Sequence, residues 1–350
     1  MDEKLRVGII GYGFASRTFH APVITSIPNL QLTKIVQRNS TSANEQYPEV
    51  EVVSHVDDLY QDDAIDLVVV ATPSTDHVKF VRDALLAGKH VVVEKPFTTT
   101  SAEAGELTQL AKAQGKVLSV FHNRRWDGDF MTLRRVLDGG MVGVVKEAVF
   151  RWDRYIPDAN PDKWRDSNAL GSGVLYDLGV HFFDQVLCLF GKPDKIRAEL
   201  RSLRADTKAD DYFDVTLGFR HDLSVTIKST VLAREPGPRY VVHGTKGSFV
   251  KYGNDPQEQA LIAGRSPAES GWGKESQEMW GTLNTVVNNL HVVGTVETVA
   301  GAYQAYYQNM YDAITGRAEL IVKPEEAKMA IKLIELALVS SREGRTVDVE

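Results

Sequence analysis

The sequence predicts an α/β protein whose N-terminal, doubly wound parallel sheet is followed by a C-terminal α+β domain with a large, mostly antiparallel sheet. Three observations support this prediction. The chain has 350 residues, which exceeds the usual size of a single hydrophobic core. Its first third alternates Val/Ile/Leu-rich runs with segments of helical periodicity. The remainder contains alternating strands separated by turn residues, so we expect one domain over residues 1–122 and a second over 123–350.

Five buried parallel strands are expected in the first domain, because five apolar runs are each closed by a turn signal. These runs are Leu5–Ile10, Leu32–Val36, Ile65–Ala71, His90–Glu94 and Val117–Phe121. Helical spacing lies between them, for example over Asp76–Gly88 and Ser101–Gln114. We expect Ser101 to be the N-cap of the second of these helices. Strands separated by helices indicate a sheet that is covered on both faces.

The second domain is expected to be α+β, because its strands are linked by hairpin-like turns. Helices are predicted at Phe130–Leu137 and Tyr176–Phe190, and the stretch Asn254–Trp280 is predicted to be a long irregular connection over a site or an interface. Two C-terminal helices, Tyr303–Gly316 and Pro324–Arg342, are expected, and such a terminal helix often returns to the first domain. The predicted strands are Lys146–Trp152, Lys195–Leu203, Tyr212–Phe219, Leu223–Val231 and Arg239–His243.

Composition excludes several classes of function. The net charge of −7 argues against a nucleic-acid surface, and no apolar stretch approaches the length that spans a bilayer. Cys188 is the only cysteine, which excludes an intrachain disulfide, and no secretory signal is recognisable, so we expect a cytoplasmic protein. The nine histidines are scattered and predict no metal site. There is also no Gly-x-Ser-x-Gly elbow of the kind that serine hydrolases use.

A glycine-rich turn follows the first strand directly and opens a helix. It reads Gly11-Tyr12-Gly13-Phe14-Ala15-Ser16, the Rossmann dinucleotide fingerprint with Ser16 in place of the third glycine. Gly11 permits a tight turn, and Gly13 leaves room for the backbone to approach a pyrophosphate. The N–H groups at the start of the helix would face that negative charge. We therefore predict that Gly11, Tyr12, Gly13, Phe14 and Ala15 bind a dinucleotide.

The residues after the second strand favour NADP over NAD. NAD enzymes place Asp or Glu there to bind the ribose 2′-hydroxyl. This chain has Val36-Gln37-Arg38-Asn39-Ser40 instead, with no carboxylate. Arg38 could bind a 2′-phosphate and Asn39 could donate to it. The alternative for Arg38 is an ordinary surface charge.

Two further signals indicate catalysis. Glu94-Lys95-Pro96 lies at the C-terminal end of the fourth strand, the edge at which open α/β sheets bind ligands. Asp177 and His181 are spaced i, i+4, so they share one face if a helix begins near Gly173. From this spacing alone, a buried structural Asp–His pair is as good an interpretation as a catalytic one.

Together these residues resemble the Gfo/Idh/MocA oxidoreductases, the glucose-fructose oxidoreductase and inositol dehydrogenase family, over nearly the full chain. Within the family the sequence is most similar to the NADP-dependent scyllo-inositol dehydrogenase branch, through segments 123–127, 175–179 and 252–258. The matching motifs are Gly11-Tyr12-Gly13, Ala71-Thr72-Pro73 with His77, Glu94-Lys95-Pro96, and Asp177 with His181.

The resemblance implies a role for each group. His181 would be the general base, Lys95 would stabilise charge on the same substrate oxygen, and Asp177 would hold the neighbouring hydroxyl. The expected activity is hydride transfer between NADP and a secondary hydroxyl of a cyclic polyol or sugar, with scyllo-inositol as the best candidate. The resemblance adds to the expected cofactor contacts Thr72, Pro73, His77, Glu94 and Lys95. The expected substrate contacts are Asn123, Arg124, Tyr155 and Trp164.

Two alternatives on the same fold remain open, and both are separable by experiment. One is a glycosidase that borrows a tightly held nicotinamide and would release free sugar without net cofactor reduction. The other is a nucleotide-sensing regulator, which predicts loss of Lys95, Asp177 and His181, although all three are present. A homodimer or homotetramer is expected, because the antiparallel sheet has a second face to cover.

Overall fold

The computed structural model describes residues 4–160, 166–167 and 169–350. Contacts within the chain divide it into two compact units, each built from three separate segments. Two later segments of the chain return to the first unit, whereas the sequence predicted a return only for the C-terminal helix. The first unit comprises Met1–Trp126, Pro256–Trp272 and Ala302–Lys328, and the second comprises Asp127–Asp255, Gly273–Gly301 and Met329–Glu350.

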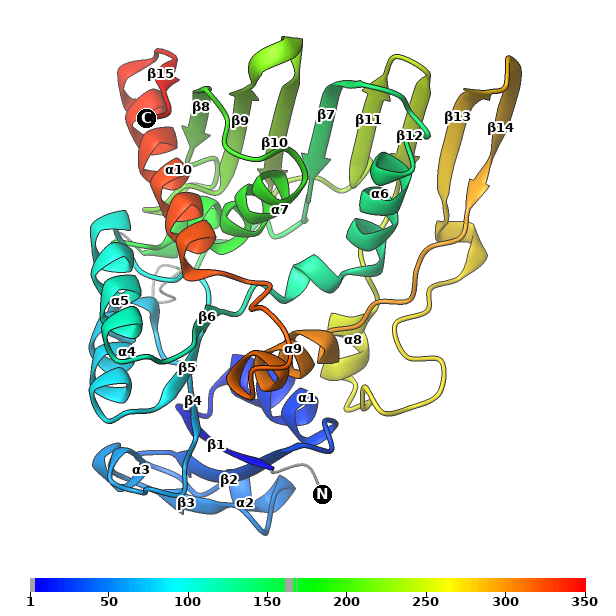
Figure 1. The fold of residues 1–350 in the computed structure, drawn as a ribbon. Coiled ribbons are helices and arrows are strands. Elements are labelled where there is room, and N and C mark those ends of the chain that lie inside the picture. The colour runs from blue at the N-terminus through cyan, green and yellow to red at the C-terminus, as the bar shows by residue number, and fades with distance from the viewer. Residues whose placement is uncertain (1–3, 161–165, 168) are drawn as a thin grey trace. The chain divides into compact units, whose positions relative to one another are not determined.

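The first unit contains a six-stranded sheet in the order β3-β2-β1-β4-β5-β6, with every neighbouring pair parallel (Figure 1). The predicted Rossmann sheet is confirmed, with one additional short edge strand. Because β4 and β5 are covered on both faces, their sequences are apolar runs without alternation. The strands are β1 Leu5–Ile10, β2 Leu30–Val36, β3 Glu51–Val53, β4 Leu67–Val70, β5 His90–Val93 and β6 Leu118–Val120.

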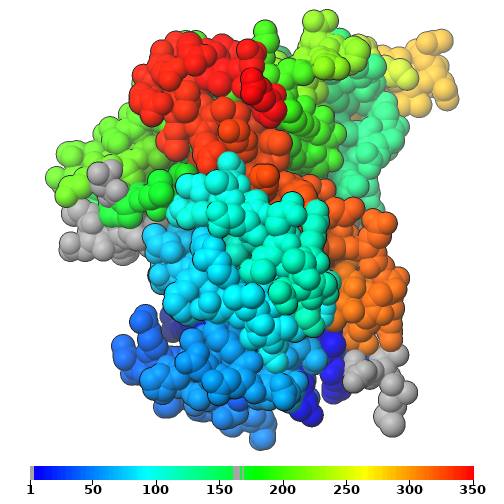
Figure 2. Space-filling model, turned by 60° about the vertical axis from the view of Figure 1, so that its left-hand side comes forward, coloured from blue at the N-terminus to red at the C-terminus, as the bar shows by residue number. Residues whose placement is uncertain are grey.

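Helices connect these strands, and α4 (His77–Leu86) lies beside α5 (Ser101–Ala113). Both contribute to the cyan surface in Figure 2. The N-cap of α5 is Thr100 and not Ser101, because Thr100 and Glu103 form a reciprocal capping box. The first helix begins with a π-helical turn, Ser16–His20, and continues as α1, Ala21–Thr25. Two short helices, α2 (Ala43–Gln46) and α3 (Asp57–Tyr60), complete the connections.

The late segments of the chain supply part of the first unit's core. Tyr303, Tyr306 and Tyr307, at or near the start of α9 (Gln304–Ile314), are buried against the sheet helices. The stretch predicted to be irregular, Asn254–Trp280, instead contains α8 (Gln257–Ile262). Gln257 is fully buried there, because its side chain accepts from Trp272 Nε1 at 3.0 Å and donates to Trp126 O at 3.1 Å.

The second unit contains a nine-stranded sheet in the order β14-β13-β12-β11-β7-β10-β9-β8-β15. It is mostly antiparallel, as predicted, and one pair, β10 with β7, is parallel. Strand β9 alternates buried and half-buried residues, as expected when one sheet face packs on helices. The strands are β7 Val145–Arg151, β8 Lys195–Arg201, β9 Tyr212–Gly218, β10 Ser224–Thr230, β11 Tyr240–Gly244, β12 Gly247–Lys251, β13 Gly281–Val287, β14 Leu290–Val296 and β15 Val347–Asp348.

Three helices lie along one face of this sheet: α6 (Gly128–Asp138), α7 (Val180–Phe190) and α10 (Pro324–Glu343) (Figure 1). The C-terminal half of α10 is tied to β8, because Ser340 Oγ accepts from Ala198 N at 2.9 Å. Within the described part of the chain, no helix is both long and apolar enough to cross a membrane.

Candidate active site

The glycine-rich turn has the geometry that a dinucleotide requires. Gly11 has φ of +91°, and a Cβ there would lie 2.8 Å from Ala71 O, so no other residue fits without strain. A Cβ on Gly13 would meet nothing within 4 Å, which leaves open space for a pyrophosphate. Ser16 is buried, and its Oγ donates to Gly11 O at 2.6 Å. The serine in place of the third glycine therefore fastens the helix to the turn.

The sheet topology collects the predicted cofactor residues of the first unit at one edge. Gly11, Arg38, Thr72 and Lys95 follow the C-terminal ends of β1, β2, β4 and β5, which are consecutive in the sheet. This is the edge at which parallel α/β sheets bind ligands. Arg38 and Asn39 are exposed there. Of the turn's own side chains, Tyr12 donates to Gln46 at 3.1 Å, Phe14 is exposed and Ala15 is half-buried.

His77 connects two loops at this edge, the one after β4 and the one after β5. Its Nδ1 lies 2.9 Å from Pro96 O, and its Nε2 lies 3.1 Å from Thr72 O. The side chain is buried, and this burial lowers the pKa of His77 despite the neighbouring carbonyls. His77, which we predicted to contact the cofactor, is thus placed to hold the Thr72-Pro73 loop against the loop after β5.

Glu94 is also buried, and its carboxylate faces inward. Its Oε2 accepts from Lys95 N at 3.0 Å, and its Oε1 lies 2.8 Å from His20 Nε2. Although burial opposes ionisation, the hydrogen bond from His20 and the charge of Lys95 hold the pKa of Glu94 below its ordinary value. The Lys95–Pro96 peptide bond is cis. Glu94 therefore supports the Lys95 loop from within the unit and has little surface to offer a cofactor.

His20 is a residue that the sequence reasoning missed. It lies in the π-helical turn after the glycine motif, and its Nδ1 is 2.6 Å from Tyr307 Oη. The available signal was a histidine in an otherwise apolar stretch of the first helix. Sequence proximity gave no indication of its partners, because Tyr307 is 287 residues away.

Two predicted substrate contacts, Asn123 and Arg124, lie in a short 3₁₀ turn after β6, Asn123–Trp126. Both are buried, and Arg124 Nη2 forms an ion pair with Glu258 of α8 at 2.7 Å. The pair joins the end of the sheet to the returning segment of the chain. This arrangement favours a structural role for Arg124 within the first unit.

In the second unit, Asp177 and His181 lie on one continuous helical segment. It begins at Gly173, as predicted, but passes through a π-helical turn, Leu175–Gly179, before α7. Both side chains are buried, and Arg154 Nη1 lies 3.7 Å from Asp177 Oδ2. π-Helical turns are rare and are frequent at functional sites, and two of the segments that we singled out contain one: the helix after the glycine turn and the Asp177 segment.

The other two predicted substrate residues are Tyr155 and Trp164. Tyr155 is exposed, accepts from Arg234 Nη2 at 2.9 Å, and lies beneath that guanidinium at 4.0 Å from the ring centre. Trp164 lies outside the described residues. Lys95 belongs to the first unit, whereas Asp177 and His181 belong to the second.

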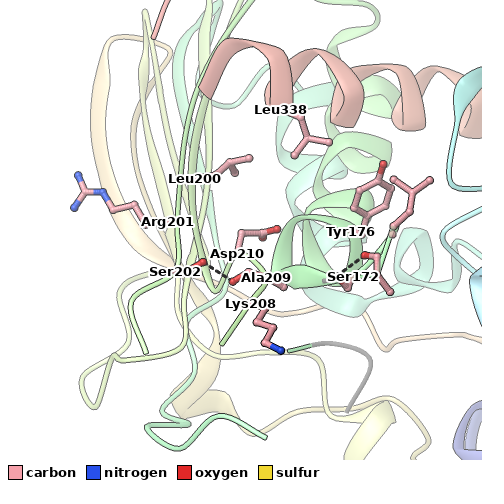
Figure 3. A pocket seen from close by; sticks show the side chains of 12 residues that line it. Ser172, Tyr176, Leu200, Arg201, Ser202, Lys208, Ala209, Asp210 and Leu338 are labelled. Atoms are coloured by element: carbon pink, nitrogen blue, oxygen red, sulfur yellow. Dashed lines mark hydrogen bonds between the residues drawn. The ribbon is translucent and has the colours of Figure 1, made fainter. Parts of the chain in front are cut away.

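A pocket of about 420 Å³ adjoins the segment that carries Asp177 (Figure 3). Asp210 lines it and accepts from Leu175 N at 2.7 Å, so its carboxylate holds the start of the π-helical turn. Burial raises the pKa of Asp210 to about 6. The lining residues are Ala169, Leu170, Gly171, Ser172, Tyr176, Leu200, Arg201, Ser202, Lys208, Ala209, Asp210 and Leu338. Across the described residues, no three His, Cys, Asp or Glu side chains gather in a way that would hold a metal ion.

Two family models match the chain. The model described as the oxidoreductase family, NAD-binding Rossmann fold, matches residues 5–122. The model described as the oxidoreductase family, C-terminal alpha/beta domain, matches residues 134–349. Both are models of the family called GFO/IDH/MocA, and together they account for most of the chain.

Similar proteins cover the chain from end to end. The oxidoreductase YdgJ of Escherichia coli is 42% identical and covers 99% of both chains. The scyllo-inositol 2-dehydrogenase (NADP⁺) IolW of Bacillus subtilis is 37% identical over 99% of this chain and 97% of its own. Among solved structures, the oxidoreductase yvaA of B. subtilis is 37% identical and superimposes with a TM-score of 0.96, covering 100% of this chain and 99% of its own.

Proposed function

The chain belongs to the Gfo/Idh/MocA family of NAD(P)-binding oxidoreductases, and from that premise we propose that it transfers hydride between NADP and a secondary hydroxyl of a cyclic polyol or sugar. The best candidate pair is scyllo-inositol and its inosose. The observation that carries this proposal is the alignment of Gly11, Arg38, Thr72 and Lys95 at one sheet edge, combined with the activity named for the 37% identical relative.

The first unit offers the residues that a dinucleotide needs. The space above Gly13 fits a pyrophosphate, and Tyr12, Phe14 and Ala15 complete the turn. We assign the 2′-phosphate of NADP to Arg38 and Asn39, because both are exposed beyond β2 and no carboxylate occupies their place. When bound, the nicotinamide supplies hydride chemistry that protein side chains lack.

The proposal assigns two side chains to the reacting substrate hydroxyl and a third to the neighbouring one. His181 takes the hydroxyl proton, since an imidazole is an efficient general base near neutral pH. Lys95 donates a hydrogen bond to the same oxygen and stabilises its developing negative charge. Asp177 accepts from the neighbouring hydroxyl, and Tyr155 and Trp164 are proposed to complete substrate binding. In the reverse direction the same groups would protonate the oxygen of a reduced ketone.

The test is turnover by purified protein. Absorbance of the reduced cofactor is followed with NADP or NAD and a panel of inositols, sugars and polyols. We expect oxidation of scyllo-inositol with NADP, and a loss of kcat of about 10²- to 10³-fold in Lys95→Ala. Lys79→Ala, on the exposed surface of the same unit, is the matched control and should retain full activity. Release of free sugar from glycosides without net cofactor reduction would replace the dehydrogenase with the glycosidase alternative.

We also propose that the protein works in the cytoplasm as a homodimer or homotetramer. Helices cover one face of the nine-stranded sheet. Its edge hairpin, β13–β14, exposes five large aliphatic side chains and has no charged residue within its strands. Long apolar edges of this kind favour pairing with another chain. Sedimentation equilibrium tests this, and a monomer at all concentrations would contradict it. The exposed side chains are Val286, Val287, Leu290, Val292 and Val293.

A further inference from the structure

A chain of buried polar groups connects two distant segments of the first unit to Glu94 and to the backbone of Lys95. Tyr307 Oη, from α9, lies 2.6 Å from His20 Nδ1. His20 Nε2, from the helix after the glycine turn, lies 2.8 Å from Glu94 Oε1. The other oxygen of Glu94 accepts from Lys95 N at 3.0 Å. His20 and Tyr307 are fully buried, and Glu94 is nearly so.

One tautomer of His20 satisfies every link. Burial raises the pKa of Tyr307 far above its ordinary value, so its hydroxyl keeps the proton and donates to Nδ1. Nε2–H then donates to the ionised Glu94, and the second carboxylate oxygen is left to accept from Lys95 N. The hydrogen bonds therefore have one direction, from Tyr307 through His20 to Glu94.

Packing alone does not explain a histidine at this position. The ring lies 4.3 Å from the ring of Phe121 and next to aromatic side chains of α9, surroundings that a phenylalanine would suit. An isolated buried carboxylate is costly, and its partner is therefore essential. His20 also lies on the helix that Ser16 fastens to Gly11. The same helix thus contacts the glycine turn through Ser16 and the Lys95 loop through His20.

We propose that His20 is a positioning residue for Lys95: it donates to one oxygen of Glu94 and so fixes the carboxylate, whose other oxygen holds the Lys95 backbone in place. The link couples the dinucleotide turn to the lysine that acts on the substrate. The inference rests on the proposed function only in treating Lys95 as a catalytic residue. The hydrogen-bonded chain is independent of that assignment.

The charge environment of Glu94 predicts how the protein responds when His20 is lost. In the wild type, the pKa of Glu94 is lowered by His20 and Lys95 against the effect of burial. Without the hydrogen bond from His20, less counteracts the effect of burial, and the pKa of Glu94 rises. Glu94 then takes up a proton at a higher pH and loses the negative charge that holds Lys95 N. The titratable groups that face Glu94 are His20, Lys95, His77, Tyr306 and Tyr307.

Two substitutions separate the hydrogen bond from the mere presence of a polar side chain. In His20→Gln, the amide nitrogen reaches the position of Nε2 and retains the donor to Glu94. In His20→Asn, the shorter amide reaches only the position of Nδ1, and the donor is lost. We expect kcat of His20→Asn to fall by about 10- to 100-fold, as for a misplaced catalytic group, while His20→Gln stays within about threefold of wild type. Tyr307→Phe, which leaves Glu94 its donor, should also change kcat little.

The pH profile distinguishes positioning from general loosening. Glu94 adds its own acid limb to kcat/KM beside that of the general base His181. This added limb should move upward by about one to two pH units in His20→Asn, the shift expected when a charged hydrogen bond is lost. The limb that Glu94 contributes should disappear in the double variant His20→Asn/Glu94→Gln, which leaves only the limb set by the general base His181. Equal profiles for His20→Asn and His20→Gln, or a loss of kcat that is the same at every pH, would overturn the proposal.

A readout without turnover keeps this proposal separate from the assignment of the substrate. Acetic anhydride labels lysines according to their surroundings, and the labelling of Lys95 relative to exposed Lys79 is measured by mass spectrometry. We expect this ratio to change at least about threefold in His20→Asn and to stay constant in His20→Gln. If the wild type oxidises no polyol but the ratio changes as expected, the proposed function fails and the positioning role stands. An unchanged ratio overturns the positioning role itself.

Discussion

Replacing Asp210 by Asn should stabilise the protein above pH 6 and remove part of its pH dependence. Burial raises the pKa of Asp210 from 3.8 to about 6, so between these values the folded state binds more protons than the unfolded state. By linkage, this carboxyl favours folding most below pH 3.8 and opposes it increasingly as the pH rises to 6. The difference corresponds to at most about 3 kcal/mol. Because the adjoining pocket admits solvent, we expect about 1–2 kcal/mol.

The amide variant suits this test, because its oxygen retains the hydrogen bond from Leu175 N that anchors the Asp177 turn. Asp210 lines a pocket with room for water, which can accept from the new N–H groups. Urea unfolding, followed by tryptophan fluorescence at several pH values from 4 to 8, gives the free energy of unfolding of both proteins. The variant should match the wild type near pH 4 and exceed it at pH 8. A difference that is constant with pH, or a variant less stable at pH 8, would refute the reasoning.

Three further changes have expected outcomes. Arg38→Ala should raise KM for NADP by about 10- to 100-fold and leave KM for NAD nearly unchanged, because only NADP has a phosphate for this guanidinium; initial rates with both cofactors measure it. Gly11→Ala should abolish cofactor binding and destabilise the fold by about 2–3 kcal/mol, because its Cβ would lie 2.8 Å from Ala71 O at φ of +91°; calorimetric titration and urea unfolding test both effects. Thr100→Ala should lower the free energy of unfolding by about 1 kcal/mol, because Glu103 N loses its cap; an unchanged urea midpoint would contradict it.

Much of the first sheet could be predicted, because β4 and β5 are nearly uniform apolar runs and because a glycine or proline follows β1, β4 and β5 within three residues. The missed strand β3 shows where the pattern fails, since Glu51–Val53 is a short, exposed edge without a continuous apolar run. The N-cap of α5 was misplaced by one residue. Thr100 and Ser101 are both good caps, and only the bond to Glu103 N distinguishes them.

The returning segments could not be predicted, because their stability depends on partners that lie far away in the sequence. Gln257 is a polar residue in a Gly/Pro-rich stretch, yet it is buried through bonds to Trp126 and Trp272. His20 is a similar case among the site residues, since its role depends on Glu94 and Tyr307. Lys95, Asp177 and His181 could be identified from the sequence, because they lie in motifs whose residues are close together along the chain. Their cooperation on one substrate stays a prediction.

Because the segments of the two units alternate along the chain, the first unit cannot be completed until late in synthesis. A chain that has emerged only as far as Trp126 holds the whole six-stranded sheet, but the tyrosines of α9 that complete its core follow almost two hundred residues later. At roughly 5–20 residues per second, the nascent sheet waits about 10–40 s for them. During that interval its apolar surface is open to chaperones and to other nascent chains. The emergence of α9, and not that of the glycine motif, is therefore the event that completes the nucleotide-binding half.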